Sequence, residues 1–410
     1  MKILLVNDIG RATGGAELQM LSLRKRLRDR GIDVRLFSSE ASLVADKELL
    51  ADYSCFGSDT KLQVLTQTAN LSAYLQLRKI LAEFEPDVVH LRIFLGQLSP
   101  LILPLLKEIP CLYQMAMYRP ICPKGTKTLP DGQPCQYKAG RVCLSKAKCM
   151  TPQSWAVLML QKQLWKHWRD NIDCMVALSH GMKERLEAEG ITPIEVVYNG
   201  VTERPMRPAL SNPPTVAFAG RLVATKGVEV LIKAFAIARE TIPQARLIIA
   251  GSGEEESAYR ELAIALNIDR AITWLGHVSR TELEQQFDRA WVQVIPSLWA
   301  EPFGNVTTEA MMRGTAVIAS AVGAQPEIVD DGTTGFLVQP GNETALAAKL
   351  TLLLSSRELA SQMGQSGRER ALTEFSEDKR DRIFLEIYAR LIAQYSANRT
   401  TKALSFKSRF

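Results

Sequence analysis

Two glutamates, Glu301 and Glu309, are separated by seven residues in a segment that reads Glu-Pro-Phe-Gly-Asn-Val-Thr-Thr-Glu. An apolar, β-branched run, Trp291–Ile295, precedes them and a helix-favouring run follows. We therefore expect Glu301 on the loop that leaves a strand and Glu309 inside the next helix. Free N–H groups at a helix N-terminus favour anions, and a carboxylate one turn further can accept two hydrogen bonds from a ribose diol. The segment predicts a site for a sugar nucleotide.

Two cations, Arg221 and Lys226, follow another predicted strand, Thr215–Ala219. A planar guanidinium and a compact ammonium suit a pyrophosphate leaving group, whose charge develops as its bond breaks. Taken alone, the two side chains could equally be exposed and bind nothing. Together with the two glutamates they indicate phosphate binding.

Glycines end several of the predicted strands. Gly14 and Gly15 follow the first strand, where they would let the backbone approach a phosphate; a plain strand-to-helix turn is the alternative. The spacing is not Gly-x-Gly-x-x-Gly, and no acidic residue ends the second strand, although Glu40 follows closely, so a nicotinamide enzyme is disfavoured. Gly251 and Val278 follow two later strands, where backbone groups could face a ligand and its base.

The elements that must position these residues alternate between short apolar runs and helical stretches. This order predicts an α/β protein with two doubly wound parallel sheets and ligands at the carboxyl ends of the strands. The predicted strands are Ile3–Val6, Val34–Phe37, Val88–Leu91, Pro110–Tyr113, Met175–Leu178, Ile194–Tyr198, Thr215–Ala219, Ala245–Ala250, Ile272–Trp274, Trp291–Ile295 and Ala316–Ala319. The predicted helices include Glu17–Arg30, Leu71–Glu83, Pro152–Arg169, Val230–Ala238 and Glu377–Tyr395.

The same pattern predicts the domain limits. The length of 410 residues favours two domains. We expect a first domain over 1–201, a proline-rich linker over 202–214 and a second domain over 215–376. The chain then ends in a helix over 377–395 and a mobile tail over 396–410. The helix could cross back to the first domain.

Composition and charge limit the location of the protein and the kinds of partner that we expect it to bind. Hydrophobic residues make up 46% of the chain and charged residues 23%, and there is no spanning apolar run and no signal-peptide pattern. We therefore expect a cytoplasmic protein, with peripheral contact at the inner face of the membrane as an open alternative. The net charge of +6 resides in residues 101–150, which hold eight Lys/Arg and two Asp/Glu. This segment favours an anionic lipid or a phosphorylated substrate, or is a solvated face; no nucleic-acid partner is predicted.

The motifs together resemble the retaining glycosyltransferases of family 4, also called group 1, over nearly the whole chain. The matching segments are Gly14-Gly15, Tyr198–Val201, Gly220–Leu222 with Lys226-Gly227, Gly251–Gly253, Pro296-Ser297, Glu301–Gly304 with Glu309-Ala310, and Gly335–Val338. The resemblance implies the GT-B fold, in which two Rossmann-like domains face each other across a cleft. It also implies catalysis without a metal or another cofactor, and retention by front-face attack with the leaving phosphate as base.

The resemblance also assigns roles to single residues. Arg221 and Lys226 would hold the nucleotide diphosphate, Glu309 the ribose hydroxyls and Glu301 the hydroxyls of the donor sugar. Phe303, Gly304 and Asn305 would touch the sugar through their backbone, and Gly14 and Gly15 would close over the phosphates. The expected reaction moves a hexose from a UDP-sugar first, or GDP-mannose second, to a saccharide or lipid-linked hydroxyl, in cell-envelope polysaccharide biosynthesis.

One departure from the family concerns Ala116 and Met117, which occupy the positions of a usual His-Asp pair. His90, at the end of a neighbouring strand, could contact substrate or be a buried structural histidine. Without the His-Asp pair, the protein could use a different acceptor, use an unusual donor or have lost its activity. A catalytically inactive sugar-nucleotide-binding protein is therefore the alternative function.

Two further segments of the sequence each have two possible interpretations. Cys122, Cys135, Cys143 and Cys149 crowd into one basic segment and are candidates for a structural zinc site, although they form no Cys-x-x-Cys pair and free thiols are the alternative. The stretch Gln153–Asp170 carries three tryptophans and three cations and could lie on a membrane surface. We favour a helix whose tryptophans pack beneath the sheet.

Overall fold

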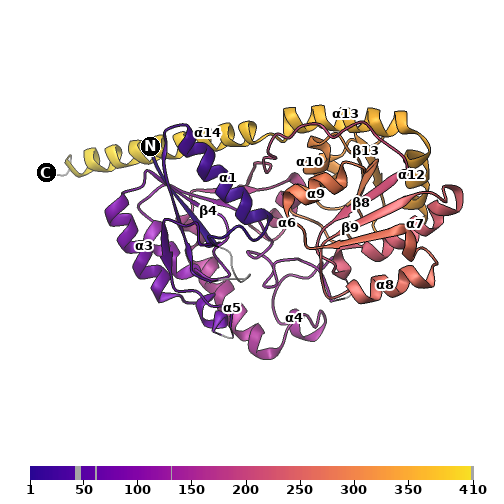
Figure 1. Ribbon diagram of the computed structural model, residues 1–410. Coiled ribbons are helices and arrows are strands. Elements are labelled where there is room, and N and C mark those ends of the chain that lie inside the picture. The colour runs from indigo at the N-terminus through magenta and orange to yellow at the C-terminus, as the bar shows by residue number, and fades with distance from the viewer. Residues whose placement is uncertain (42–47, 61, 131, 408–410) are drawn as a thin grey trace. The chain divides into compact units, whose positions relative to one another are not determined.

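The computed structural model describes residues 1–41, 48–60, 62–130 and 132–407, with side chains to residue 397. The chain divides into two compact units (Figure 1). Unit 1 consists of Met1–Pro130, Cys135–Tyr198 and Arg380–Phe410, and unit 2 of Asp131–Pro134 and Asn199–Lys379.

Unit 1 is built on a seven-stranded sheet in the order β3-β2-β1-β4-β5-β6-β7, and all of its paired strands are parallel. Its strands are β1 (Lys2–Ile9), β2 (Asp33–Ser39), β3 (Tyr53–Cys55), β4 (Val88–Leu91), β5 (Cys111–Gln114), β6 (Cys174–Ala177) and β7 (Glu195–Val196). Leu4 and Leu5 point to opposite faces of β1 and both are fully buried. Such burial on both faces explains why the strands of a parallel sheet are continuously apolar.

The helices of unit 1 begin at recognisable capping residues. Asn70 accepts a hydrogen bond from the Ala73 amide at the start of α3, and Thr151 accepts one from Ser154 at the start of α5. The helices are α1 (Gly15–Asp29), α2 (Gln63–Thr66), α3 (Leu71–Phe84), α4 (Val142–Ser145), α5 (Pro152–Trp168) and α6 (His180–Glu187), with 3₁₀ turns η1 (Pro100–Leu106) and η2 (Arg169–Asn171).

Unit 2 repeats the plan with a six-stranded parallel sheet in the order β10-β9-β8-β11-β12-β13. Its strands are β8 (Thr215–Ala219), β9 (Arg246–Ala250), β10 (Ile272–Gly276), β11 (Val292–Ile295), β12 (Ala316–Ser320) and β13 (Gly335–Val338). Its helices are α7 (Val228–Thr241), α8 (Glu256–Ala265), α9 (Arg280–Phe287), α10 (Asn305–Met312), α11 (Gln325–Ile328), α12 (Glu343–Ser355) and α13 (Arg357–Glu374), with 3₁₀ turns η3 (Ala224–Lys226) and η4 (Asp269–Ala271). Two parallel sheets with helices confirm the predicted α/β class.

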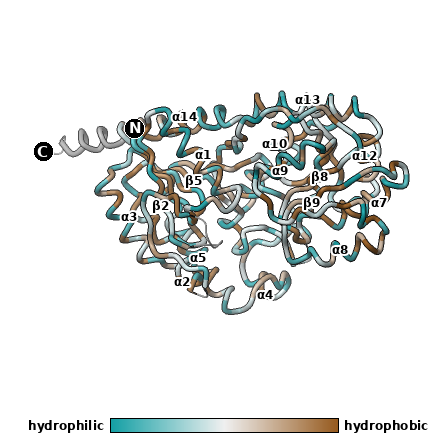
Figure 2. Tube along the Cα trace, viewed as in Figure 1, coloured by the Kyte–Doolittle hydropathy of each residue, from teal (hydrophilic) through white to brown (hydrophobic). Residues whose placement is uncertain are grey.

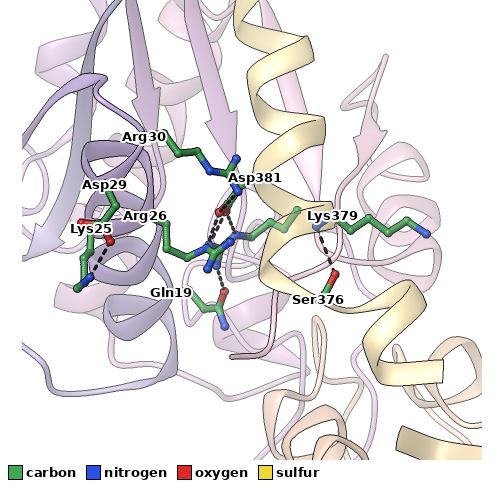
Figure 3. Close-up of polar contacts among 9 residues, drawn as sticks. Gln19, Lys25, Arg26, Asp29, Arg30, Ser376, Lys379 and Asp381 are labelled. Atoms are coloured by element: carbon green, nitrogen blue, oxygen red, sulfur yellow. Dashed lines mark hydrogen bonds and ion pairs between the residues drawn. The ribbon is translucent and has the colours of Figure 1, made fainter. Parts of the chain in front are cut away.

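The last helix, α14 (Glu377–Lys407), starts in unit 2 and continues in unit 1 from Arg380 onward. Inside unit 1 the fully buried Asp381 of α14 pairs with Arg26 of α1 at 2.6 Å and with its own neighbour Arg380 at 2.6 Å. Arg380 also donates a 2.7 Å hydrogen bond to Gln19 of α1. Figure 3 shows Arg26 and Arg30 of α1 pointing toward Asp381. This buried ionic cluster holds α14 against α1.

The structure corrects the predicted end of this helix. Residues 396–407, expected as a mobile tail, continue α14. The reason is local, because this stretch contains neither proline nor glycine to stop a helix. Residues 408–410 lie outside the described part of the chain.

The proline-rich segment 202–214 forms no strand or helix, but it packs on unit 2 as part of that unit. Arg207 and Leu210 are buried, the Arg207 amide donates to the Arg313 carbonyl at 2.9 Å, and the Trp291 indole donates to the Ser211 carbonyl at 2.8 Å. The unit boundary therefore lies at Tyr198/Asn199, three residues before the predicted one.

The distribution of hydropathy along the chain is mapped in Figure 2. No helix in the described ranges combines the length and the apolar character needed to cross a bilayer.

Candidate functional site

The carboxyl edge of the unit 2 sheet brings Lys226 and Glu301 together. Lys226 lies in η3 after β8, Glu301 lies on the loop after β11, and these two strands are neighbours in the sheet. The Lys226 ammonium donates to the Glu301 carboxylate at 2.7 Å, and the Ser297 hydroxyl donates to the same oxygen. Both side chains are mostly buried. The structure thus joins a cation and a carboxylate that lie 75 residues apart in the sequence.

Glycines allow the two loops to pack this closely. Gly227 adopts a φ of +68°, and a Cβ at this position would lie 2.0 Å from the Pro296 carbonyl oxygen. Gly323 has a φ of +64°, and its Cβ would lie 2.6 Å from the backbone nitrogen of Glu301. Any other residue would be strained at both positions and would push the Glu301 loop away. Backbone contact between loops therefore sets the position of the carboxylate.

Helix α10 starts directly beside this pair. Its N-cap is Gly304, which has a φ of +135° and supplies no side chain to bond the free amides of the first turn. The Phe303 side chain is buried against Phe375, with ring centroids 5.9 Å apart. Asn305 accepts a 2.9 Å hydrogen bond from the side-chain amide of Asn199. The amides after Gly304 are therefore a suitable place for an anion or a sugar oxygen.

Glu309 lies one turn further along α10 and enters a network of alternating charges. Its carboxylate accepts a 3.0 Å hydrogen bond from Arg280 of α9, and Arg280 also bonds Glu284 at 3.2 Å. Arg204 approaches Glu284 at 3.5 Å. These four residues line a pocket in unit 2. Burial there raises the pKa of the Glu309 carboxyl above its ordinary value, while Arg280 and Arg204 oppose the shift.

The remaining predicted donor-binding residues of unit 2 lie at the carboxyl ends of neighbouring strands. The Arg221 side chain follows β8, is exposed, and has no hydrogen bond or ion pair with another described residue. Gly251 follows β9 with a φ of +132°, and a Cβ there would lie 1.9 Å from the Gly220 carbonyl oxygen. Val278 follows β10 two residues before α9 and is half-buried. Arg221, Gly251 and Val278 therefore share one sheet edge with Lys226 and Glu301.

Gly14 and Gly15 belong to unit 1, where they start α1 after β1. The φ of Gly14 is −149°, a conformation open to any residue. A Cβ at Gly14 would instead lie 2.7 Å from a carboxylate oxygen of Glu17. Because that oxygen ends a flexible side chain, the contact does not by itself require a glycine at this position.

His90 is a structural residue. It is fully buried, its Nδ1 forms a 2.6 Å hydrogen bond with the Tyr388 hydroxyl, and its ring centroid lies 4.9 Å from that of Phe384. Burial, with Arg92 as a lesser cause, lowers its pKa to about 3. Contact with substrate, one of the two expected roles, does not fit this position beneath α14. Ala116 and Met117, after β5, are half-buried.

Sequence reasoning missed several polar residues at the strand ends of unit 1. Asp8 ends β1, and its carboxylate accepts hydrogen bonds from the amides of Gly96, Gln97 and Leu98 at 2.6 to 2.9 Å. Burial raises its pKa to about 6. Arg92 follows β4, is buried, and donates to the Gln114 side chain of β5. The sequence signal that could have identified these residues is a polar residue at the end of each apolar run.

The clustered cysteines do not form the candidate zinc site. Within the described ranges, no three His, Cys, Asp or Glu side chains gather in an arrangement that could hold a metal ion. Cys135 and Cys143 are buried, Cys122 and Cys149 are half-buried, and all four are free thiols. Burial first, and the thiols of Cys143, Cys135 and Cys122 after it, raise the pKa of the Cys149 thiol, while the Cys135 sulfur approaches the Tyr137 carbonyl at 3.9 Å.

Comparisons with known protein families cover most of the chain. Residues 201–370 match the model described as glycosyl transferases group 1, and residues 14–200 match a glycosyl transferase 4-like domain.

Curated relatives are similar over different spans. A glycogen synthase of Mycobacterium tuberculosis is 31% identical over 208 residues, which are 50% of each chain. An alpha-maltose-1-phosphate synthase of Mycolicibacterium smegmatis is 32% identical over 54% of this chain and 64% of its own length. A D-inositol 3-phosphate glycosyltransferase of Corynebacterium aurimucosum is 27% identical over 87% of each chain. The chain therefore spans about half the length of the first of these relatives.

Solved structures share the fold at low identity. A sucrose-phosphate synthase from Thermosynechococcus elongatus superimposes with a TM-score of 0.72 at 21% identity, covering 96% of this chain and all of the other. Anabaena HepE in complex with UDP and glucose gives 0.68 at 20% identity, covering 95% and 99%. These matches confirm the predicted pair of Rossmann-like units.

Proposed function

Because the chain belongs to the group 1 glycosyltransferases and has their GT-B fold, we propose that it transfers a hexose from a nucleotide diphosphate sugar with retention of configuration. The acceptor in this proposal is a hydroxyl group of a saccharide or of a lipid-linked molecule. A UDP-sugar is the first choice of donor and GDP-mannose the second. The proposed reaction requires neither a metal nor an organic cofactor.

The observation that carries this proposal is the pairing of Lys226 with Glu301 beside the start of α10. Lys226 and the exposed Arg221 lie on one loop, where both can reach a diphosphate and neutralise the charge that grows as the sugar leaves. Glu301 then accepts hydrogen bonds from the hydroxyl groups of the sugar. The backbone of Phe303, Gly304 and Asn305 borders the same position.

Glu309 supplies the second half of donor recognition. Its carboxylate lies about one helical turn from Gly304 and already accepts a hydrogen bond from Arg280. A carboxylate has acceptor sites for more than one donor, so it can bond both hydroxyls of a ribose while Arg280 holds it. Gly251 and Val278, at the same edge, offer backbone groups to the base.

The proposed chemistry needs no side-chain base. The bond between the sugar C1 and the diphosphate oxygen breaks, and the acceptor oxygen forms a new bond to C1 on the same face. The proton of the acceptor hydroxyl passes to the departing phosphate oxygen. Lys226 and Arg221 stabilise the leaving group, and each such interaction contributes roughly 10²- to 10³-fold to rate in comparable sites.

Nucleotides bound to structural neighbours support the choice of donor. HepE was solved with UDP-glucose, and TarM with UDP. The curated relatives carry names of enzymes that build or modify sugars. We therefore place UDP-sugars before GDP-mannose.

The test is release of free nucleotide from a panel of UDP- and GDP-sugars. We expect slow hydrolysis of one donor, and loss of at least about 100-fold in Glu309→Ala, because the ribose loses its carboxylate partner. Glu343→Ala is the matched control, since Glu343 is a similarly exposed helical glutamate on α12 of the same unit. Equal rates in the two variants would contradict the role of Glu309.

An inactive sugar-nucleotide-binding protein is the second candidate, favoured by Ala116 and Met117. Thermal unfolding with UDP and GDP separates the two, because a ligand of the folded state raises the melting temperature with its concentration. A nucleotide that raises the melting temperature, without cleavage of any donor, would establish the inactive alternative.

A further inference from the structure

Arg280 bridges two carboxylates of unit 2 through different nitrogen atoms. Its Nε donates to Glu284 at 3.2 Å, and one of its terminal nitrogens donates to Glu309 at 3.0 Å. Because a guanidinium is planar and holds its donors at fixed angles, this one side chain fixes the two carboxylates relative to each other. The Nε of Arg204 lies 3.5 Å from the Glu284 carboxylate. We call Arg204, Glu284, Arg280 and Glu309 the charge chain.

The stability of helix α9 does not explain the position of Arg280. Arg280 is the first residue of α9, and Glu284 lies four residues later in the same helix. The N-terminus of a helix carries a partial positive charge, which disfavours a cation there. An arginine placed four residues before a glutamate is also the weaker order for an ion pair on one helix. The position of Arg280 therefore fits a role toward Glu309 of α10 better than a role within α9.

The charge chain lines a pocket in which Glu309 keeps room for a ligand. Apolar side chains form other walls of this pocket, namely Leu283, Phe287 and Val306. Arg313 also lines the pocket and pairs with Asp288. The Glu309 side chain is 39% exposed, and Arg280 bonds one of its two oxygens. An ionised carboxylate has about four acceptor positions, so Glu309 can accept further hydrogen bonds while it stays bonded to Arg280.

We propose that Arg280 and Glu284 are positioning residues for nucleotide recognition. Glu284 holds Arg280, and Arg280 holds the Glu309 carboxylate in the orientation from which it accepts both hydroxyls of a ribose. The ligand class is therefore a ribonucleoside diphosphate, and its 2′-deoxy form binds more weakly because the carboxylate loses a donor. The inference rests on the proposed function, which assigns Glu309 to the ribose.

The same contacts make nucleotide affinity depend on pH, because the ionised carboxylate accepts both hydroxyls and the protonated one does not. Burial raises the pKa of Glu309, Arg280 and then Arg204 oppose this rise, and Glu284 adds to it. Loss of Arg280 should therefore raise the pH below which affinity falls. Loss of Arg204 should raise it less, and loss of Glu284 should lower it.

The test is isothermal titration calorimetry of the full chain with UDP and with GDP, followed by the 2′-deoxy form of whichever binds more tightly. We expect the ribonucleotide to bind the unmodified chain at least about 10-fold more tightly than the deoxy form. In Arg280→Gln this ratio should fall to about threefold or less, because Glu309 is no longer held. Arg280→Lys should restore part of the ratio, since it keeps the charge without the planar fork. Glu284→Gln should lower the ratio by a smaller factor than Arg280→Gln.

A pH series with the tighter-binding ribonucleotide adds a readout that a general loss of structure would not move. The fall of affinity at low pH should occur at higher pH in Arg280→Gln and at lower pH in Glu284→Gln than in the unmodified chain. The phosphate of the free nucleotide titrates alike with every variant, so the difference between variants comes from the protein. Melting curves check that each variant folds, and Arg280→Lys and Glu284→Gln carry the test where Arg280→Gln does not.

The matched control is Lys233→Gln. Lys233 approaches Glu229 of its own helix α7 at 2.8 Å and Glu343 of α12 at 4.0 Å, and it is 40% exposed, as Arg280 is. It thus repeats the arrangement of Arg280 with residues that do not line the pocket. The control should show the ratio and the pH dependence of the unmodified chain.

The outcomes separate this inference from the proposed function. If neither UDP nor GDP binds the unmodified chain, the proposed donor site is wrong and the inference is wrong with it. Binding with an unchanged ratio and an unchanged pH dependence in Arg280→Gln overturns the inference alone. Tighter binding of the ribonucleotide by Arg280→Gln also overturns it, because Arg280 would then compete with the ribose for Glu309.

Discussion

Single residues of this protein owe their chemistry to the groups that surround them. Glu301 and Glu309 have the same side chain, yet one is bonded to a lysine and a serine and the other to an arginine of a neighbouring helix. His90 and Asp8 both end strands of unit 1, and burial shifts both toward their neutral forms. The type of a residue therefore predicts its role only where the sequence also predicts which groups will surround it.

At this scale we predict a pH dependence of stability that originates in His90. Its folded pKa of about 3 lies below its ordinary value, so between about pH 3 and 6.5 the unfolded chain binds more protons at this position than the folded chain. Stability should therefore rise with pH across this window, by an amount on the order of a few kcal/mol. The measurement is urea unfolding at several pH values.

The variant His90→Gln should flatten that rise, since it removes the titrating group. Asp8 acts with the opposite sign, because its raised pKa of about 6 makes stability fall between about pH 4 and 6. Asp8→Asn should therefore steepen the rise. An unchanged slope in His90→Gln would show that another group causes the dependence.

At the scale of elements, backbone contacts between loops shape the candidate site. The loop from β8 to α7 touches the loop after β11 at Gly227, and the Leu298 amide donates to the Thr225 carbonyl at 2.9 Å. These loops connect neighbouring parallel strands, so their ends meet at one edge of the sheet. Their packing brings Lys226 within bonding distance of Glu301.

We predict that Gly227→Ala lowers both stability and nucleotide affinity. The added methyl group would meet the Pro296 carbonyl oxygen at 2.0 Å, so one loop must move. Gly332→Ala is the control, because Gly332 also has a positive φ, +80°, but a Cβ there meets no atom within 4 Å. Both variants carry a backbone strain of about 1 kcal/mol.

Thermal unfolding and titration with UDP compare the two variants. Gly227→Ala should lose an additional 1–3 kcal/mol or so of stability through overpacking and bind the nucleotide more weakly, whereas Gly332→Ala should bind it normally. Equal behaviour would mean that the close approach of the two loops has no functional importance.

At the scale of the whole molecule, the C-terminal helix completes unit 1. Asp381 of α14 lies fully buried beside Arg380 and Arg26, and Phe384 and Tyr388 join the core formed by β1 and α1. Residues from opposite ends of the chain therefore share one hydrophobic core. The last helix therefore contributes part of the core of unit 1.

We predict that Asp381→Asn destabilises the protein by about 3–5 kcal/mol, because it removes the fully buried carboxylate that pairs with the buried Arg380. Asp29→Asn, on α1, is the control. Asp29 is 58% exposed and, among the described residues, pairs only with the exposed Lys25, and such a surface pair contributes about 1 kcal/mol at most. Denaturant unfolding of both variants provides the measurement, and a similar small loss in each would contradict the importance of the buried cluster.

Much of the architecture could be predicted because periodicity is a local property. The apolar strands β1, β4, β8 and β12 have the alternation with helices that a parallel α/β sheet requires. The strands β3 and β13 were not predicted, since β3 has only three residues and β13 begins with a glycine. The end of α14 was misplaced because a mobile tail was assumed where nothing stops the helix.

The sequence by itself determined the order of elements, the two parallel sheets and the identity of the polar residues that follow their strands. These properties depend on neighbours along the chain. Only the tertiary structure decided that Lys226 bonds Glu301, that Glu309 bonds Arg280 and that His90 is covered by Tyr388. It also decided that four neighbouring cysteines form no metal site within the described residues. The physical reason is that distance, burial and charge at a site arise from packing between segments far apart in sequence.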